Sequence, residues 1–248
     1  MELIDELLVG GADMHVHNMM LKGYRWNLVE VANRAIEAGM GGMVLKNRYG
    51  ASSEMAYFVN HLVGKDICLG SIVLNQWAGG LNAFAVREYL KIGAGIKVVF
   101  MPTGHSLNHQ RRHVNGNVDK AVRLFKGHKV LPEFEEILDI IAKNDLVLAT
   151  GHISPEESLL LIDAAQKAGV KKILVTHASA IPVMASLEEQ KEMVRKGALI
   201  EQCMATCMPF HCIRMKQRFG IDVDYNTEKI IRHMIEIGIE HCIKWLLS

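Results

Sequence analysis

Asp13-Met14-His15-Val16-His17 closes the first apolar run of the chain, which extends from Leu8 to His17. In a β-strand, residues two apart point to the same side, so His15 and His17 face a common point. Imidazole nitrogen binds zinc, iron, nickel or copper, so the pair indicates a metal site without naming the metal. The chain holds twelve histidines, and a chance occurrence of the spacing is the alternative.

Along the chain, apolar runs alternate with amphipathic runs. The predicted strands are Leu8 to His17, Gly42 to Lys46, Ile67 to Leu74, Ile96 to Met101, Leu146 to Thr150, Ile173 to Thr176 and Ala198 to Cys203. The predicted helices are Leu28 to Ala38, Ser52 to Leu62, Ala83 to Ile92, Leu131 to Asn144, Ser158 to Ala168, Leu187 to Lys196 and Thr227 to Ile237. Glycine directly follows several of these helices, as expected of a left-handed C-cap.

Near-continuous apolar strands separated by helices predict a parallel sheet covered by helices. An eighth strand is expected to open at Glu240 to Ile243, which gives the count of an α/β barrel of the TIM (β/α)8 type. A doubly wound open sheet is the alternative, but no glycine-rich phosphate fingerprint follows the first strand.

The composition predicts one domain over residues 1–248, because 248 residues, half of them apolar, match the size of one barrel. A formal net charge of +1 argues against binding to nucleic acid or to a membrane surface. No apolar run has the length of a membrane span, and the first residues do not resemble a signal peptide, so we expect a cytoplasmic protein that binds a small molecule. The five cysteines are expected to be reduced thiols.

Two later histidines extend the metal hypothesis. His152 follows the fifth predicted strand and His177 follows the sixth, at the strand ends where barrel enzymes place their chemistry. Four imidazoles from strands one, five and six are therefore expected to converge. A second, separate zinc site at Cys203, Cys207, His211 and Cys212 is disfavoured, because the spacing differs from that of common structural zinc sites.

This arrangement resembles the amidohydrolase superfamily. The resemblance extends over the whole chain through Val44-Leu45-Lys46, Leu74-Asn75, Gly79-Gly80-Leu81-Asn82, Met101-Pro102-Thr103, Thr150-Gly151-His152-Ile153-Ser154 and Thr176-His177-Ala178. It implies a distorted (β/α)8 barrel that holds one or two divalent ions, with zinc the expected metal, and that hydrolyses C–N, C–O or P–O bonds. It also implies that His15, His17, His152 and His177 are the metal ligands.

The chain departs from the superfamily pattern at strand four, which often supplies a carboxylated lysine or a glutamate that bridges two metals. Here that strand ends in Phe100-Met101-Pro102-Thr103, whereas Lys46 ends strand two. Lys46 is a ligand after carboxylation, a cation that polarises the substrate, or an ordinary lysine at a strand end. We expect Lys46 and His177 to be catalytic residues, His177 acting as a ligand or as a proton donor to the substrate.

The second departure concerns the aspartate that normally ends strand eight, binds metal and accepts the proton of the attacking water. No acidic residue follows His241, and Glu201, Asp222 and Asp224 are the candidates for this role. Asp13 is expected to be structural. The eighth strand and helix are expected to be incomplete, which would leave strands one and seven as free edges and favour self-association into a homo-oligomer.

Other polar residues have two interpretations each. His105, His109 and His113 are spaced by four and would line a lid on one helix face, but we favour a solvated loop between Thr103 and Pro132. Arg48 either grips a carboxylate or phosphate in bidentate fashion or is a surface residue.

The sequence thus predicts a metal-dependent hydrolase of a small amide, cyclic amide or ester. The alternatives are a metal-dependent phosphoesterase and a catalytically inactive metal-binding barrel, the latter because the strand-eight aspartate is missing.

Overall fold

A computed structural model describes residues 8–17, 26–222 and 227–244 of the chain. Seven parallel strands form a curled half-barrel sheet, and a short eighth strand, β10, extends it beside β9. The order along the sheet is β1-β2-β3-β4-β7-β8-β9-β10. The strands are β1 (Ala12–His17), β2 (Gly42–Lys46), β3 (Cys68–Val73), β4 (Ile96–Phe100), β7 (Val147–Ala149), β8 (Lys172–Val175), β9 (Leu199–Gln202) and β10 (Cys242–Lys244).

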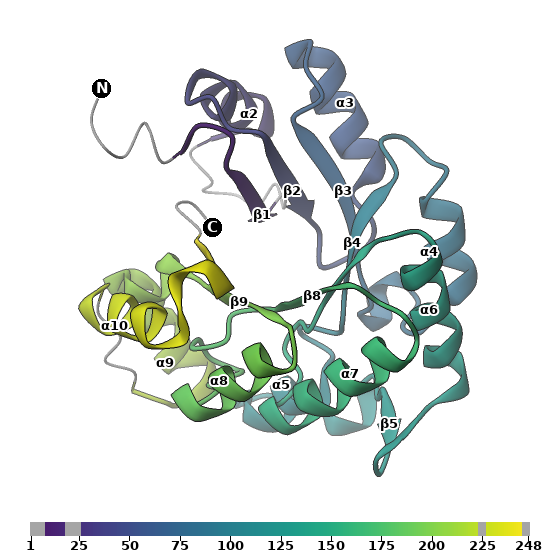
Figure 1. Ribbon diagram of the computed structural model, residues 1–248, viewed down its shortest axis with the longest axis vertical. Coiled ribbons are helices and arrows are strands. Elements are labelled where there is room, and N and C mark those ends of the chain that lie inside the picture. Colours follow the sequence, from purple (N-terminus) through teal and green to yellow (C-terminus); the bar gives the residue numbers. More distant parts are fainter. Residues whose placement is uncertain (1–7, 18–25, 223–226, 245–248) are drawn as a thin grey trace.

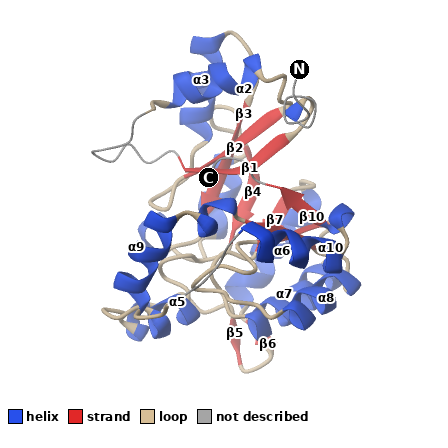
Figure 2. Cartoon of the chain, turned by 90° about the vertical axis from the view of Figure 1, so that its left-hand side faces the viewer, coloured by secondary structure: helices blue, strands red, loops and turns tan. Residues whose placement is uncertain are grey.

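Helices cover the outer, convex side of this sheet, as Figures 1 and 2 show. The described residues form nine α-helices: α2 (Leu28–Glu37), α3 (Ser53–Val63), α4 (Ala83–Tyr89), α5 (Leu107–Arg112), α6 (Pro132–Lys143), α7 (Pro155–Lys167), α8 (Leu187–Arg195), α9 (Pro209–Phe219) and α10 (Thr227–Ile237). Capping boxes begin α2, α7 and α8, where an Asn or Ser accepts the backbone N–H of a Glu three residues later. These signals fix where the helices start.

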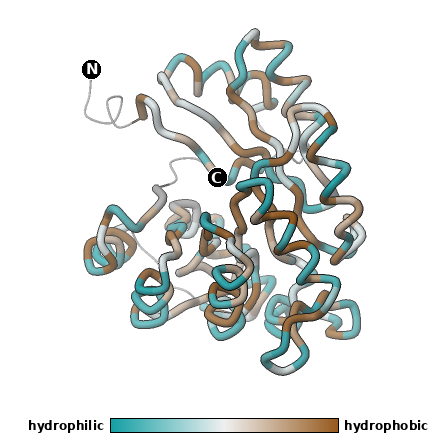
Figure 3. The backbone as a smooth tube through the Cα atoms, turned by 45° about the vertical axis from the view of Figure 1, so that its right-hand side comes forward, coloured by the Kyte–Doolittle hydropathy of each residue, from teal (hydrophilic) through white to brown (hydrophobic). Residues whose placement is uncertain are grey.

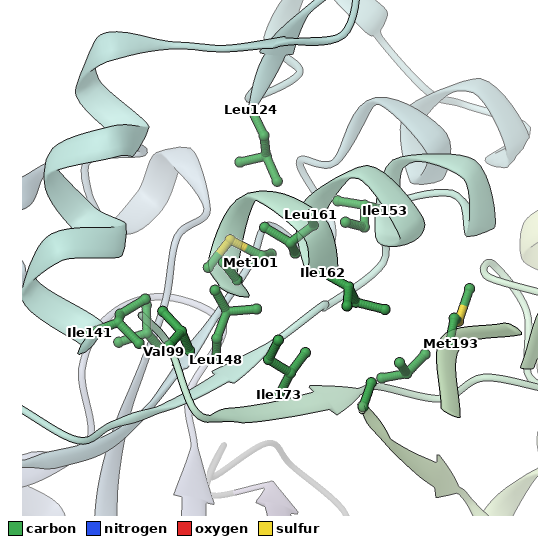
Figure 4. Close-up of a cluster of buried hydrophobic side chains, with 14 of the residues drawn as sticks. Val99, Met101, Leu124, Ile141, Leu148, Ile153, Leu161, Ile162, Ile173 and Met193 are labelled. Atoms are coloured by element: carbon green, nitrogen blue, oxygen red, sulfur yellow. The ribbon is translucent and has the colours of Figure 1, made fainter. Parts of the chain in front are cut away.

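The main apolar core lies between the sheet and the outer helices. Figure 3 shows hydrophobic residues along the strands and the sheet-facing sides of the helices, and Figure 4 shows part of this core. Val99 of β4, Leu148 of β7 and Ile173 of β8 pack there against Ile141 of α6 and Leu161 of α7. Because side chains alternate across a strand, the residues next to these face the other way.

The inner face of the sheet carries a second, smaller apolar cluster. Its buried members are Val44, Val73, Val98, Phe100, Ala149 and Leu174, one or two from each of β2, β3, β4, β7 and β8. This layer fills the concave side of the sheet in the manner of a barrel interior. Inward-facing residues nearer to the carboxyl ends of the same strands therefore lie on an apolar floor.

The expected distorted (β/α)8 barrel is confirmed only as a TIM-like, open half-barrel, and its predicted free edges are corrected. Within the part of the chain that the structure describes, β10 pairs with β9 in parallel, and no ladder joins β10 to β1. The free edges are accordingly β1 and β10, and not β1 and the seventh strand as predicted. β10 comprises three residues within the described range, which ends at Lys244.

The long segment from Thr103 to Pro132 is more ordered than a solvated loop. It contains α5, the short 3₁₀-helix Val118–Lys120 and a hairpin of β5 (Phe125–Lys126) with β6 (Lys129–Val130). His105 is buried within it, so the interpretation of this segment as a solvated loop is wrong. The segment after Cys203 likewise contains a helix, α9, that the sequence pattern did not indicate.

No helix in the described ranges combines the length and the apolar character that crossing a membrane requires.

Candidate metal centre

Three side chains, two from strands β1 and β9 and one from the turn after β8, converge at the carboxyl-terminal rim of the sheet. The Nδ1 atoms of His15 and His177 lie 2.8 Å and 3.0 Å from the same oxygen, Oε1 of Glu201. One potential ligand atom from each of the three residues lies within 4.8 Å of the other two. His15 and Glu201 are completely buried, and His177 keeps 13 % of its side-chain surface exposed. The three residues make a compact buried donor set.

The backbone around this group positions its members. Glu201 is on β9 next to Ile200, which faces the outer core, so the alternation of the strand points Glu201 inward. His177 comes two residues after the end of β8 and has a left-handed φ of 51°. Non-glycine residues adopt this region rarely, and such backbone strain is concentrated at functional sites. The N–H of Ala178 donates to the carbonyl oxygen of Glu201 (3.1 Å), which links the two residues.

Lys46 lies in the same buried cluster. Its Nζ is 2.8 Å from Nε2 of His15 and sits 4.4 Å from the centre of the Phe100 ring. The residue is only 1 % exposed, so the interpretation as an ordinary strand-end lysine reaching solvent is excluded. Burial, helped by the nearby Arg48, lowers the pKa of Lys46 to about 7, although the Glu201 carboxylate opposes the shift.

The electrostatics of the three converging residues are coupled. Burial alone raises the pKa of Glu201, but the imidazoles of His15 and His177 outweigh it and hold that pKa well below its usual range. Burial and the Lys46 ammonium lower the pKa of His15 to about 3. Burial also lowers the pKa of His177, but the Glu201 carboxylate reverses the net direction and raises it. Glu201 is thus the buried negative charge around which the neighbouring groups are arranged.

The two other predicted ligands border this group. The ring centre of His17 is 4.9 Å from that of His15, and that of His152 is 5.3 Å from that of His177. Neither residue belongs to the set of three whose ligand atoms lie within 4.8 Å of one another. All four predicted histidines therefore lie in one cluster, with His15 and His177 central and His17 and His152 on either side.

His109 joins the cluster, although the sequence reasoning did not place it there. Its Nδ1 lies 2.9 Å from Nδ1 of His152, and the two rings stack at 5.1 Å. The helix that carries it, α5, is tied to His152 itself: Ser106 Oγ and Asn108 Nδ2 both donate to the carbonyl oxygen of His152 (2.7 and 3.2 Å). The spacing by four was the available signal, because it predicts a helix with His109 and His113 on one face, where they stack at 5.6 Å.

These residues suit a divalent cation in two respects. Imidazole and carboxylate are donors that zinc and similar cations accept. In addition, Nδ1 of His17 and Oε2 of Glu201 are buried without a hydrogen-bond partner within the described structure. Buried polar atoms normally have hydrogen-bond partners, and coordination of an ion is one recognised reason for an exception.

Where the structure describes them, the other predicted acidic and cysteine candidates do not join this cluster as metal ligands. Asp222 is an exposed residue that pairs with Lys216 at 2.7 Å, away from the cluster, and Asp224 lies outside the described residues. Asp13 accepts the backbone N–H of His15 (2.9 Å), which is the structural role expected of it. Cys68, Cys207 and Cys212 are free thiols, and among the described residues no metal-binding group forms at Cys203, Cys207, His211 and Cys212.

The chain belongs to a protein family described as a family of unknown function (DUF6282), whose model matches residues 10–201. No curated protein matches the chain. One similar solved structure is deoxyribose phosphate aldolase from Aeropyrum pernix, described as a unique tetramer. It is 12 % identical with a TM-score of 0.45, over 80 % of this chain and 77 % of the aldolase. Another is a prolidase in complex with N-methylphosphonate-L-proline, 14 % identical with a TM-score of 0.42, over 93 % of this chain and 60 % of the prolidase. Both proteins are named as enzymes.

Proposed function

We propose that the protein is a metal-dependent hydrolase that cleaves a small amide, cyclic amide or ester. The observation that carries this proposal is the convergence of His15, His177 and Glu201, with ligand atoms within 4.8 Å of one another in a buried site. The likeness of the sequence motifs to the amidohydrolase superfamily supports the same reaction class. Zinc is the expected metal, with one or two ions bound.

In this proposal His15, His17, His152 and His177 hold the metal, as the sequence predicted, and Glu201 is added to them. Glu201 takes the place of the missing strand-eight aspartate, because it is buried and in contact with two of the proposed ligands. These residues would hold a divalent cation, which would supply a water of lowered pKa and polarisation of the substrate carbonyl. Glu201 Oε2, which has no hydrogen-bond partner among the described residues, is the atom positioned to accept the proton of the attacking water.

His177 and Lys46 are the proposed catalytic residues. His177 is either a metal ligand, as a neutral imidazole, or a proton donor to the leaving group, and its raised pKa favours the imidazolium that the second role requires. Lys46, held against His15 and Phe100, places an ammonium or neutral amine in the site, because a pKa of about 7 makes both forms accessible at neutral pH. A neutral amine is also the form that carboxylation requires, so Lys46 is a candidate for that modification.

Two other functions make different predictions. A phosphoesterase with the same ligands would release product from aryl phosphates and not from aryl amides or esters. A catalytically inactive metal-binding barrel would hold metal without turnover of any of them. The buried carboxylate of Glu201 favours hydrolysis over the inactive alternative, since it supplies the acidic group whose absence from strand eight suggested inactivity.

Elemental analysis of gently purified wild-type protein, of the His15→Ala/His17→Ala double variant and of Glu201→Gln tests the proposal. We expect about one or two equivalents of a divalent metal in the wild type and most of it lost in both variants. Asp145→Asn is the control, because Asp145 pairs only with the exposed Lys172 and should leave the metal content unchanged. Chromogenic anilides, esters and phosphate esters then distinguish the three functions. A folded wild-type protein that binds no metal would overturn the proposal.

A further inference from the structure

Three aromatic rings lie next to one another on the loops that follow the neighbouring strands β2, β3 and β4. Tyr49 comes after β2, Trp77 lies in the 3₁₀-helix Gln76–Ala78 after β3, and His105 comes after β4. The ring centre of Trp77 is 4.8 Å from that of Tyr49 and 4.3 Å from that of His105. Because parallel strands end at one edge of a sheet, these rings lie on the same rim as the candidate metal centre.

One buried side chain, that of Asn75, ties the three loops together. Its Nδ2 donates to the carbonyl oxygen of Arg48 (3.0 Å) and to Oγ1 of Thr103 (2.9 Å). Its Oδ1 accepts the backbone N–H groups of Thr103 (2.9 Å) and His105 (3.1 Å). Asn75 is completely buried, so these hydrogen bonds do not compete with water. The three loops are therefore fixed relative to one another, and the rings that they carry are pre-organised.

Printed contacts also join these loops to the candidate ligands. Ser106, in the loop after β4, donates from Oγ to the carbonyl oxygen of His152 (2.7 Å). The loop that carries Tyr49 starts at Lys46, whose Nζ is 2.8 Å from Nε2 of His15. The aromatic rings therefore border the metal centre on the side of β2, β3 and β4.

The two larger rings leave apolar surface uncovered, and a polar atom beside them lacks a partner. Tyr49 is 50 % exposed and Trp77 is 51 % exposed. Exposed apolar surface costs free energy in water, and aromatic rings pack favourably against other aromatic rings. Nδ1 of His105 is buried and has no hydrogen-bond partner among the described residues, although buried polar atoms normally have one. A planar ring that carries a nitrogen atom suits both features.

We propose that Tyr49, Trp77 and His105 form a subsite that binds a planar heteroaromatic ring of the substrate beside the metal centre. The ring stacks on the exposed surface of Tyr49 and Trp77. A nitrogen at its edge forms a hydrogen bond with Nδ1 of His105 once the imidazole turns about its Cβ–Cγ bond, and a neutral imidazole nitrogen either donates or accepts. That the ring belongs to a hydrolase substrate rests on the proposed function, whereas the binding of the ring does not.

Ligand-observed NMR titrations with nicotinamide, benzamide and cyclohexanecarboxamide test this subsite. The three amides share a carboxamide group and differ in the ring, which is planar with a nitrogen, planar without one, and non-planar. We expect the affinity to fall in that order. The titrations use the protein after dialysis against a chelator and, separately, with zinc added, because the nitrogen of nicotinamide is itself a possible zinc ligand.

Variants assign the binding to particular rings. Trp77→Leu keeps an apolar side chain without the aromatic face and should weaken binding of nicotinamide about tenfold, with or without zinc. His105→Phe should abolish the preference for nicotinamide over benzamide. Phe58→Ala is the matched control, because Phe58 is 60 % exposed in the middle of α3, and this variant should bind like the wild type. Tyr49→Leu provides a second variant if Trp77→Leu fails to fold.

The outcomes separate this proposal from the hydrolase proposal. Equal affinity for the three amides, or equal binding by Trp77→Leu and the wild type, overturns the subsite. Equal affinity of the wild type for nicotinamide and benzamide overturns the contact with His105. Binding that requires zinc and is the same in the ring variants overturns the subsite and leaves the hydrolase proposal intact. Binding that depends on Trp77, in a protein that holds no metal as purified, supports the subsite and contradicts the hydrolase.

Discussion

The two faces of the same sheet bury side chains of very different chemical character. On the outer face, residues such as Leu148 and Ile173 pack against helices in a predominantly apolar core. On the inner face, an apolar floor that includes Phe100 supports His15, Lys46 and Glu201, which are fully or almost fully buried although they are polar or ionisable. Burial of apolar surface stabilises a fold, whereas burial of ionisable groups costs free energy unless they are paired. The outer face thus stabilises the fold, and that stabilisation offsets the free-energy cost of burying ionisable side chains on the inner face.

Truncation in the outer core gives the largest expected loss of stability. Leu148→Ala should lower the free energy of unfolding by about 2–5 kcal/mol, because Leu148 is completely buried and the substitution leaves a cavity. Urea unfolding of the chelator-treated protein measures the change. The metal content of the folded variant should equal that of the wild type, and a parallel loss of metal would show that the two faces are not independent.

Loss of the His109 imidazole tests the link between α5 and the candidate ligands. His109→Phe keeps the ring stack but removes the nitrogen that contacts Nδ1 of His152 at 2.9 Å. We expect zinc affinity to fall by about 10- to 100-fold, the usual effect of removing a group that orients a metal ligand. Competition with a chromophoric chelator measures the affinity.

His113→Phe is the control for this prediction. His113 stacks on His109, and the structure records no contact of its own with His152. An equal loss of zinc affinity in both variants would assign the effect to packing of α5 and not to the hydrogen bond.

A cap far from the site should affect stability alone. Ser186 begins α8, where its Oγ accepts the N–H of Glu189 at 3.3 Å and donates to Oε2 of that residue at 2.7 Å. Ser186→Ala should lower the free energy of unfolding by about 1 kcal/mol. Zinc affinity should stay unchanged, and a decrease would contradict the separation of the outer layer from the centre.

The smallest expected change in stability comes from the inner face itself. Lys46→Met replaces a buried amine with an apolar side chain of similar size against Phe100, while Glu201 keeps its contacts with His15 and His177. Burial holds the pKa of Lys46 at about 7, below its usual value, so the buried amine destabilises the folded state at neutral pH, and an apolar side chain removes that cost. We therefore expect the midpoint of thermal unfolding of the chelator-treated protein to stay the same or rise, together with loss of hydrolysis. A large drop in that midpoint would mean that Lys46 serves the fold.

Much of the fold was predictable because it depends on local patterns. The strand Gly42–Lys46 and the helix Thr227–Ile237 have the predicted bounds, and the other predicted strands and helices differ by a few residues at their ends. Helix α9 was missed because its apolar residues are interrupted by basic ones, and α5 because it has only six residues. Pairing at the ends of the sheet is a long-range property, so the sequence predicted strands one and seven as the free edges, whereas the described strands leave β1 and β10 there.

The sequence by itself determined which residue types would meet at the carboxyl ends of the strands. The alternation within β1 and the position of His152 and His177 after their strands bring these histidines to one rim, since parallel strands end at the same edge. It also named Glu201 as one of three candidates for the acidic role. Only the tertiary structure shows that Glu201 is the candidate that contacts His15. It also shows that Lys46 is buried against His15 and that His109 contacts His152. Such selections depend on distances between residues far apart in the chain, which the packing of the whole sheet sets and no local pattern encodes.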